Sequence, residues 1–122
     1  VDTWKLIEEF KTQKEFYVPI VRGKEMYFTL FQEKMVKNKY GIDEPIEKEE
    51  INKEFLDLMI VPLVGYDQNY YRLGYGGGYY DRYLKDFKAP TIGLAYSFQY
   101  MKHYQPEKFD IPLDDIITDK KI

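Results

Sequence analysis

Residues 67–82 concentrate the residue types that bind phosphate groups. Four of the chain's eight glycines lie in positions 74–78, between two of its three arginines, Arg72 and Arg82. Glycines let backbone N–H groups approach an anion closely, and the guanidinium of Arg72 adds a fixed charge with two parallel donors. Asp81, early in the segment that follows, could hold a divalent cation or complement the positive end of a helix. The pattern indicates a site for a phosphorylated ligand.

A purely structural interpretation of the same residues stays open. The glycines could form only a tight turn, and Asp81 could be an ordinary carboxylate in the first turn of a helix. The common nucleotide motifs do not match, because Tyr79 replaces the third glycine of the dinucleotide fingerprint and no Gly-Lys-Ser/Thr follows. On the ligand interpretation, Gly77→Val would clash with the ligand and leave the fold intact.

The elements around the glycine loop must place it at the edge of a sheet. Residues 56–65 form a nearly continuous apolar run, which is typical of a strand buried on both faces of a parallel sheet. Residues 78–87 have helical spacing, 91–96 form another buried strand and 112–118 end in a last strand. This order predicts an α/β fold of three layers, with a mostly parallel sheet flanked by helices in a Rossmann-like topology. Ligands of such folds bind beyond the carboxyl ends of the strands, where the loop falls.

The N-terminal part of the chain is less informative. Residues 3–13 have the spacing of an amphipathic helix, and 16–21 and 26–31 are short strands that could form a hairpin, or the second could lie outside the main sheet. Residues 41–50 are acidic without a period and predict a surface loop, not a domain boundary. We therefore expect a single α/β domain over residues 1–122.

Composition and charge exclude several classes of function. The chain of 122 residues has a net charge of −3, which argues against bulk binding to nucleic acid or to an anionic membrane. It has no cysteine and one histidine, His103, so disulfides, thiolate metal sites, thiol catalysis and multi-histidine metal sites are excluded. The apolar run 58–65 is far shorter than the ~18 residues of a membrane span. We expect a cytoplasmic protein with no nucleic-acid partner and no membrane partner.

The loop sequence also resembles a known family. Residues 72–82, Arg-Leu-Gly-Tyr-Gly-Gly-Gly-Tyr-Tyr-Asp-Arg, are similar to the signature of the 5-formyltetrahydrofolate cyclo-ligases, also called methenyltetrahydrofolate synthetases. The similarity extends over essentially the whole chain. It continues in Gly41-Ile-Asp-Glu-Pro45, in Asp57-Leu-Met-Ile-Val-Pro62 followed by Asp67, in Gly93-Leu-Ala-Tyr96 with Gln99, and in Asp110, Asp114 and Ile117-Thr118-Asp119.

This resemblance implies a reaction and a set of site residues. The reaction is the ATP- and Mg²⁺-dependent cyclisation of 5-formyltetrahydrofolate to 5,10-methenyltetrahydrofolate, with release of ADP and phosphate. Arg72 and Tyr79 would be catalytic, and Asp81 and Asp110 would hold the magnesium. The resemblance assigns ATP binding to Arg72, Leu73, Gly74, Tyr75, Gly76, Gly77, Gly78, Tyr79 and Tyr80. It assigns folate binding to Tyr75, Gly76, Gly77, Gly78 and Tyr79.

Three further expectations follow from the resemblance. The family has an N-terminal segment, before the equivalent of Val1, with basic residues for ATP and a glutamate for the pterin, so the chain is expected to be the C-terminal part of the cyclo-ligase domain. Alone it would bind nucleotide weakly and not cyclise the folate. The full-length enzyme is expected to be a monomer whose partner is the small-molecule substrate. The alternative is a non-catalytic α/β domain that binds a nucleotide or phosphate ligand, and formation of the folate product separates the two.

Overall fold

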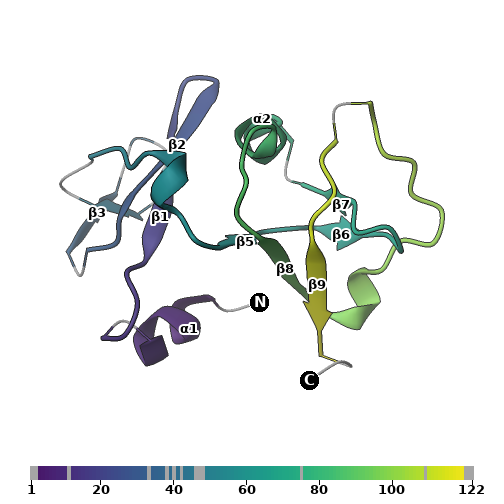
Figure 1. The fold of residues 1–122 in the computed structure, drawn as a ribbon, viewed down its shortest axis with the longest axis horizontal. Coiled ribbons are helices and arrows are strands. Elements are labelled where there is room, and N and C mark those ends of the chain that lie inside the picture. Colours follow the sequence, from purple (N-terminus) through teal and green to yellow (C-terminus); the bar gives the residue numbers. More distant parts are fainter. Residues whose placement is uncertain are drawn as a thin grey trace. The chain divides into compact units, whose positions relative to one another are not determined.

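The computed structural model describes residues 3–10, 12–32, 34–37, 39, 41, 43–45, 49–74, 76–108 and 110–119. The chain forms two compact units, residues 2–52 and residues 53–122. Figure 1 shows the elements of both in sequence colours. In the described part of the chain, no helix is long and apolar enough to cross a membrane. The expectation of a single domain stays a prediction.

Residues 2–52 contain a short helix and a β-hairpin. The helix α1 spans Thr3–Phe10, and the antiparallel strands β1 (Tyr17–Arg22) and β2 (Glu25–Leu30) pair along their whole length. The turn between them has Gly23 at φ 62°, a left-handed conformation that glycine adopts without steric cost. Of the two arrangements open for these strands, the structure has the hairpin. Its buried residues are Ile20, Tyr27, Phe28 and Thr29.

The acidic segment is not only a loop, which corrects the expectation for residues 41–50. Strand β4 (Asp43–Pro45) pairs antiparallel with β3 (Met35–Lys37), a strand that the sequence pattern did not predict. Glu44 is buried although it is charged, and Lys37 and Asp43 form an ion pair with Nζ and Oδ1 3.1 Å apart. Backbone pairing and the burial of Glu44 and Pro45 therefore override the unfavourable composition of β4.

Residues 53–122 are organised by a three-stranded parallel sheet. Strand β8 (Thr91–Ala95) lies between β5 (Met59–Val61) and β9 (Asp115–Thr118), as Figure 1 shows. The helix α2 (Tyr79–Leu84) lies in the connection between β5 and β8. This parallel sheet confirms the predicted α/β class. The sheet's core contains Met59, Val61, Ala95, Leu113 and Ile116.

The apolar run before the glycine loop is two strands and not one. After β5 the chain leaves the sheet at Pro62, and β6 (Gly65–Tyr66) pairs antiparallel with β7 (Arg72–Leu73). Proline has no N–H for a ladder hydrogen bond, which explains the break. The remaining short elements are two 3-10 turns, Lys53–Phe55 and Ser97–Gln99. The small β6–β7 hairpin therefore carries the start of the glycine loop.

Candidate active site

The turn of the β6–β7 hairpin is built on a buried aspartate. Asp67 Oδ1 accepts hydrogen bonds from the backbone N–H groups of Asn69, at 2.9 Å, and Tyr71, at 3.0 Å. Tyr70 has a φ of 67°, and its backbone N–H donates to the Asp67 carbonyl at 3.2 Å. An aspartate that bonds the backbone ahead of it stabilises such turns. This turn fixes where the following strand begins, and Arg72 is the first residue of that strand.

Arg72 is a buried cation with a defined position. Only 7% of it is exposed; Nη1 donates to the Pro62 carbonyl at 3.0 Å, and Cζ lies 5.1 Å from the centroid of the Tyr80 ring. Its Nε is also buried and has no hydrogen-bond partner among the described residues. Burial lowers the pKa of Arg72, and the negative charges of Asp81 and Asp110 oppose that change. A buried cation with an unsatisfied N–H is the kind of group that a ligand or an ordered water completes.

Two carboxylates act on this cation through their charge. Asp81, in the first turn of α2, accepts from the backbone N–H of Ile111 at 3.2 Å through Oδ1. Asp110, the residue before Ile111, accepts through Oδ2 from the backbone N–H of Glu107 at 2.8 Å. The chain therefore brings together two carboxylates that are far apart in the sequence. Both act electrostatically on Arg72.

The glycine loop has an unusual backbone. Gly76, Gly77 and Gly78 have φ values of 91°, 80° and 68°, three left-handed residues in a row. Residues with a side chain adopt this conformation at a cost of about 1–2 kcal/mol each. A Cβ on Gly77 would lie 2.8 Å from the Tyr79 ring. The expectation that Gly77→Val leaves the fold intact is therefore wrong, because a β-branched residue there strains the backbone before any ligand binds.

Comparisons with known proteins cover nearly the whole chain, including the residues of this site. The model of the 5-formyltetrahydrofolate cyclo-ligase family matches residues 2–119. The chain belongs to this family. It is 33% identical over 133 residues to 5-formyltetrahydrofolate cyclo-ligase of Escherichia coli K12, covering all of this chain and 73% of that protein. Over 67 residues, 53% of the chain, it is 46% identical to the cyclo-ligase of Mycoplasma pneumoniae, of which it covers 40%.

Two solved structures have the same fold. The 5,10-methenyltetrahydrofolate synthetase of Aquifex aeolicus superposes with a TM-score of 0.83 at 39% identity, over 98% of this chain. The synthetase of M. pneumoniae superposes with a TM-score of 0.72 at 35% identity, over 96% of this chain. The chain spans 63% of the length of each of these two structures. The resemblance inferred from the loop sequence is thus confirmed over nearly the whole chain.

The loop residues that the sequence assigns to ligand binding lie in environments that differ from one residue to the next. Gly74 lies against Arg72, since a Cβ on it would be 2.7 Å from Nη1. Leu73 is exposed and pairs with Gly65, and Tyr75 lies outside the described residues. The Tyr80 ring faces the Arg72 guanidinium, and burial raises the pKa of Tyr80 to about 12. The structure therefore brings Arg72, Gly74 and Tyr80 together with the two carboxylates.

Two residues near the site were given no role by the sequence interpretation. Arg82 Nη1 donates to the Gly77 carbonyl at 2.6 Å, and its guanidinium lies 5.1 Å from the centroid of the Tyr79 ring. Its position one helical turn after Gly78 was a signal for this contact. Tyr104 donates its hydroxyl proton to Asp110 Oδ2 at 3.1 Å. No spacing rule indicates that contact, because Tyr104 lies in an irregular segment.

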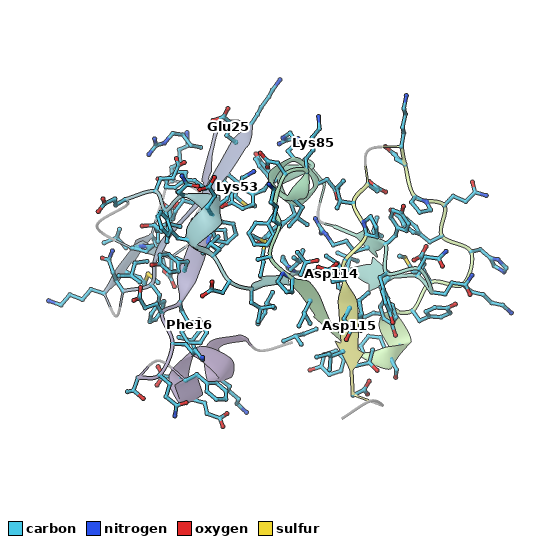
Figure 2. The ribbon with its side chains drawn as sticks, in the orientation of Figure 1. Phe16, Glu25, Lys53, Lys85, Asp114 and Asp115 are labelled. Atoms are coloured by element: carbon cyan, nitrogen blue, oxygen red, sulfur yellow. The ribbon has the colours of Figure 1, made fainter. Side chains whose placement is uncertain are left out.

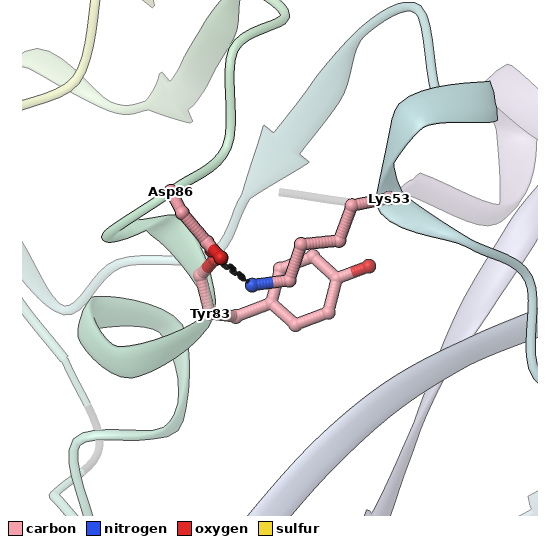
Figure 3. Close-up of polar contacts among 3 residues, drawn as sticks. All are labelled: Lys53, Tyr83 and Asp86. Carbon is pink, nitrogen blue, oxygen red and sulfur yellow. Dashed lines mark hydrogen bonds and ion pairs between the residues drawn. The ribbon is translucent and has the colours of Figure 1, made fainter.

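The far end of α2 is fixed by a lysine. Lys53 Nζ donates to the Tyr83 carbonyl at 2.7 Å and to the carboxylate of Asp86, and it lies 4.2 Å from the centroid of the Tyr83 ring (Figure 3). Cations near a helix C-terminus bond its last carbonyls favourably. Lys53 thereby holds the short helix that presents Tyr80 and Asp81.

Three side chains from the C-terminal part of the family resemblance, Gln99, Asp114 and Asp119, hold the ends of the parallel strands. Asp114, labelled beside β9 in Figure 2, accepts through Oδ2 from the backbone N–H of Thr91 at 2.8 Å. Gln99 Nε2 donates to the Val64 carbonyl at 3.1 Å, and Asp119 Oδ1 accepts from the backbone N–H of Ser97 at 2.8 Å. These side chains join the strands to the loops. Their hydrogen bonds, among the described residues, do not reach Arg72, Asp81 or Asp110. Their roles are in positioning the sheet.

Proposed function

We propose that this chain carries the ATP-dependent cyclisation of 5-formyltetrahydrofolate to 5,10-methenyltetrahydrofolate, with release of ADP and phosphate. The observation that supports it is the cluster of Arg72 with Asp81 and Asp110 beside the glycine loop. Phosphoryl transfer requires positive charge at the phosphates and precise alignment of the reacting atoms. The relatives are named for this ligase and synthetase activity.

The chemistry proceeds in two steps on the substrates. The formyl oxygen attacks the γ-phosphorus of ATP, an O–P bond forms, and the bond to ADP breaks. The neighbouring amine nitrogen then attacks the activated formyl carbon, a C–N bond forms and the nitrogen loses its proton. The C–O bond to the phosphoryl group breaks, and phosphate leaves with that proton as the ring closes. We assign the loop 74–78 to the ATP phosphates, with Tyr75 and Tyr79 toward the folate. Arg72 acts through its charge, which stabilises the charge that develops on the transferred phosphoryl group.

The two carboxylates fit a magnesium ion. Their bonds within the described residues use Oδ1 of Asp81 and Oδ2 of Asp110, which leaves the other oxygen of each for a cation. No group of three or more acidic or histidine side chains that could hold a metal occurs among the described residues. Magnesium commonly takes one or two carboxylates together with phosphate oxygens and water, so two are sufficient. A bound magnesium ion would neutralise phosphate charge, and we propose Asp81 and Asp110 as its protein ligands.

The test compares three Asp→Asn variants in the full-length enzyme, because the chain alone is expected not to cyclise the folate. Asp81→Asn and Asp110→Asn should each lower turnover and raise the Mg²⁺ concentration that gives the half-maximal rate. Asp57→Asn, an exposed aspartate in the same unit, is the matched control and should change neither quantity. Turnover is followed by the absorbance of the methenyl product formed from Mg-ATP and 5-formyltetrahydrofolate. A full-length enzyme whose melting temperature rises with ATP but which forms no product would instead support the non-catalytic nucleotide-binding domain.

A further inference from the structure

Among the described residues, only one oxygen of the Asp110 carboxylate, Oδ2, accepts hydrogen bonds. Its Oδ2 accepts two hydrogen bonds, from the Tyr104 hydroxyl at 3.1 Å and from the Glu107 backbone N–H at 2.8 Å. The Asp110 backbone N–H donates in turn to the Glu107 carbonyl at 3.1 Å. Two donors on one oxygen fix the rotation of a carboxylate that could otherwise turn about its Cβ–Cγ bond. The described bonds leave Oδ1 as the oxygen that can bind a cation.

Tyr104 also has a fixed position of its own. Its hydroxyl lies 3.5 Å from the Arg72 carbonyl, on the strand that carries the buried cation. The segment that leads to Tyr104 is joined to the same hairpin, because the Met101 backbone N–H donates to the Tyr66 carbonyl at 2.7 Å. Tyr104 is half-buried. Its hydroxyl is therefore held between β7 and Asp110.

We infer that Tyr104 is a positioning residue for magnesium, which orients Asp110 so that Oδ1 faces the ion. This inference rests on the proposed function, because it takes Asp110 as a magnesium ligand. Residues that hydrogen-bond a metal-ligating carboxylate set its direction, and their loss typically lowers metal affinity or activity by about tenfold to a hundredfold. Tyr104 contacts neither substrate nor metal in this scheme. Its loss should weaken the response to magnesium and leave the rate at saturating magnesium little changed.

The experiment compares Tyr104→Phe with Tyr100→Phe in the full-length enzyme. Both remove one hydroxyl from the same part of the chain, and Tyr100 makes a ring contact with Tyr66. Tyr104→Phe should raise the Mg²⁺ concentration for half-maximal turnover by about tenfold. It should also raise, by a similar factor, the concentration of Mg²⁺ alone that gives half of the metal-induced rise in melting temperature. Tyr100→Phe should leave both midpoints unchanged.

A double-variant comparison separates positioning from general stability. In an Asp110→Asn background, Tyr104→Phe should cause no further shift of the magnesium midpoint, because the carboxylate that it orients is gone. An equal shift in both backgrounds, or none in the wild-type background, overturns the inference. Tyr104→Met removes the hydroxyl with a different apolar side chain, so that a folding defect of one variant does not decide the result.

The outcomes also distinguish this inference from the proposed function. If Asp110→Asn alone leaves the magnesium midpoint unchanged, Asp110 is not a metal ligand, and both the metal assignment and the role of Tyr104 are wrong. If Asp110→Asn shifts the midpoint and both Tyr104 variants do not, only the role of Tyr104 is wrong.

Discussion

Gly74→Ala is the sharpest single perturbation of the site, because it adds one methyl group beside the Arg72 guanidinium. The Cβ of an alanine would lie 2.7 Å from Nη1, closer than real Cβ atoms approach a neighbour. The φ of Gly74 is not in the left-handed region, so alanine brings no backbone strain. The guanidinium must therefore move away from the Pro62 carbonyl, to which it now donates at 3.0 Å. The three left-handed glycines at positions 76–78 are left unchanged.

The size of the effect follows from what the guanidinium loses. A hydrogen bond from a charged donor contributes about 1.5–3 kcal/mol, and a partly desolvated cation over a ring about 1–2 kcal/mol. Movement by a few tenths of an ångström weakens the bond to Pro62 more than the broad contact with Tyr80. We expect Gly74→Ala to lower the free energy of unfolding by about 2 kcal/mol. ATP should also raise the melting temperature less than in the wild type, because the cation is displaced.

A double-mutant cycle with Arg72→Met provides the decisive assay. Urea unfolding gives the free energy of each variant, and the melting temperature with and without ATP gives nucleotide binding. In the Arg72→Met background, Gly74→Ala should cost close to nothing, since the flexible methionine side chain can yield to the new methyl group. A cost of about 2 kcal/mol in both backgrounds would refute the reasoning, because the methyl group would then clash with something other than the guanidinium.

The remaining predictions concern the loop, the phenol of Tyr80 and the far end of α2. Gly76→Ala and Gly77→Ala share a left-handed φ, and each should cost about 1–2 kcal/mol in urea unfolding. Gly77→Ala should cost more, since only its Cβ meets the Tyr79 ring; equal costs would contradict that contact. Burial raises the pKa of Tyr80 from its ordinary value of 10.0 to about 12. The stabilisation that the neutral phenol gives to the folded protein is therefore fully present below pH 10 and is lost as the pH rises through about 12. Tyr80→Phe should reduce the number of late-ionising tyrosines in an ultraviolet titration by one, and an unchanged late step in this variant would contradict the prediction. Lys53→Met should lower the free energy of unfolding by about 1–2 kcal/mol, through loss of the bond to the Tyr83 carbonyl of α2. It should also speed hydrogen exchange in that helix more than elsewhere, and uniform exchange would argue against a local role.

The fold could be predicted where one hydrophobic period dominates. Strand β8 and the helix α2 follow from runs that match a single pattern, and the hairpin β1–β2 follows from two aromatic and β-branched segments around Gly23. Strand β4 could not be predicted, because its partner β3 and the burial of Glu44 come from tertiary pairing that local composition does not encode. The run 56–65 was predicted as one strand because apolarity alone does not show that the chain turns at Pro62.

The site could be predicted only as far as its residue types are rare. Arg72 and the glycines stand out because few arginines and glycines occur elsewhere, and the family resemblance added Asp110 from a distant segment. The loop's left-handed backbone was not predictable in detail, since four glycines permit many conformations. Tyr104 was missed because it is one of 13 tyrosines and its contact with Asp110 depends on how an irregular segment folds back.

The order of strands in the parallel sheet has a consequence for folding kinetics. Met59 pairs with Thr91, and Ile92 pairs with Asp115. The central strand β8 therefore pairs with two strands that are distant from it in the sequence, one before it and one after it. Such pairing has a high contact order, and the entropy of loop closure must be overcome before the contacts form. Gly93, at the middle of β8, is enclosed by Leu63 and Leu113 only after the segments that contain these two leucines have packed against the strand. During synthesis, β5 and β8 therefore expose apolar surface until β9 has emerged, which makes this interval the one most open to aggregation.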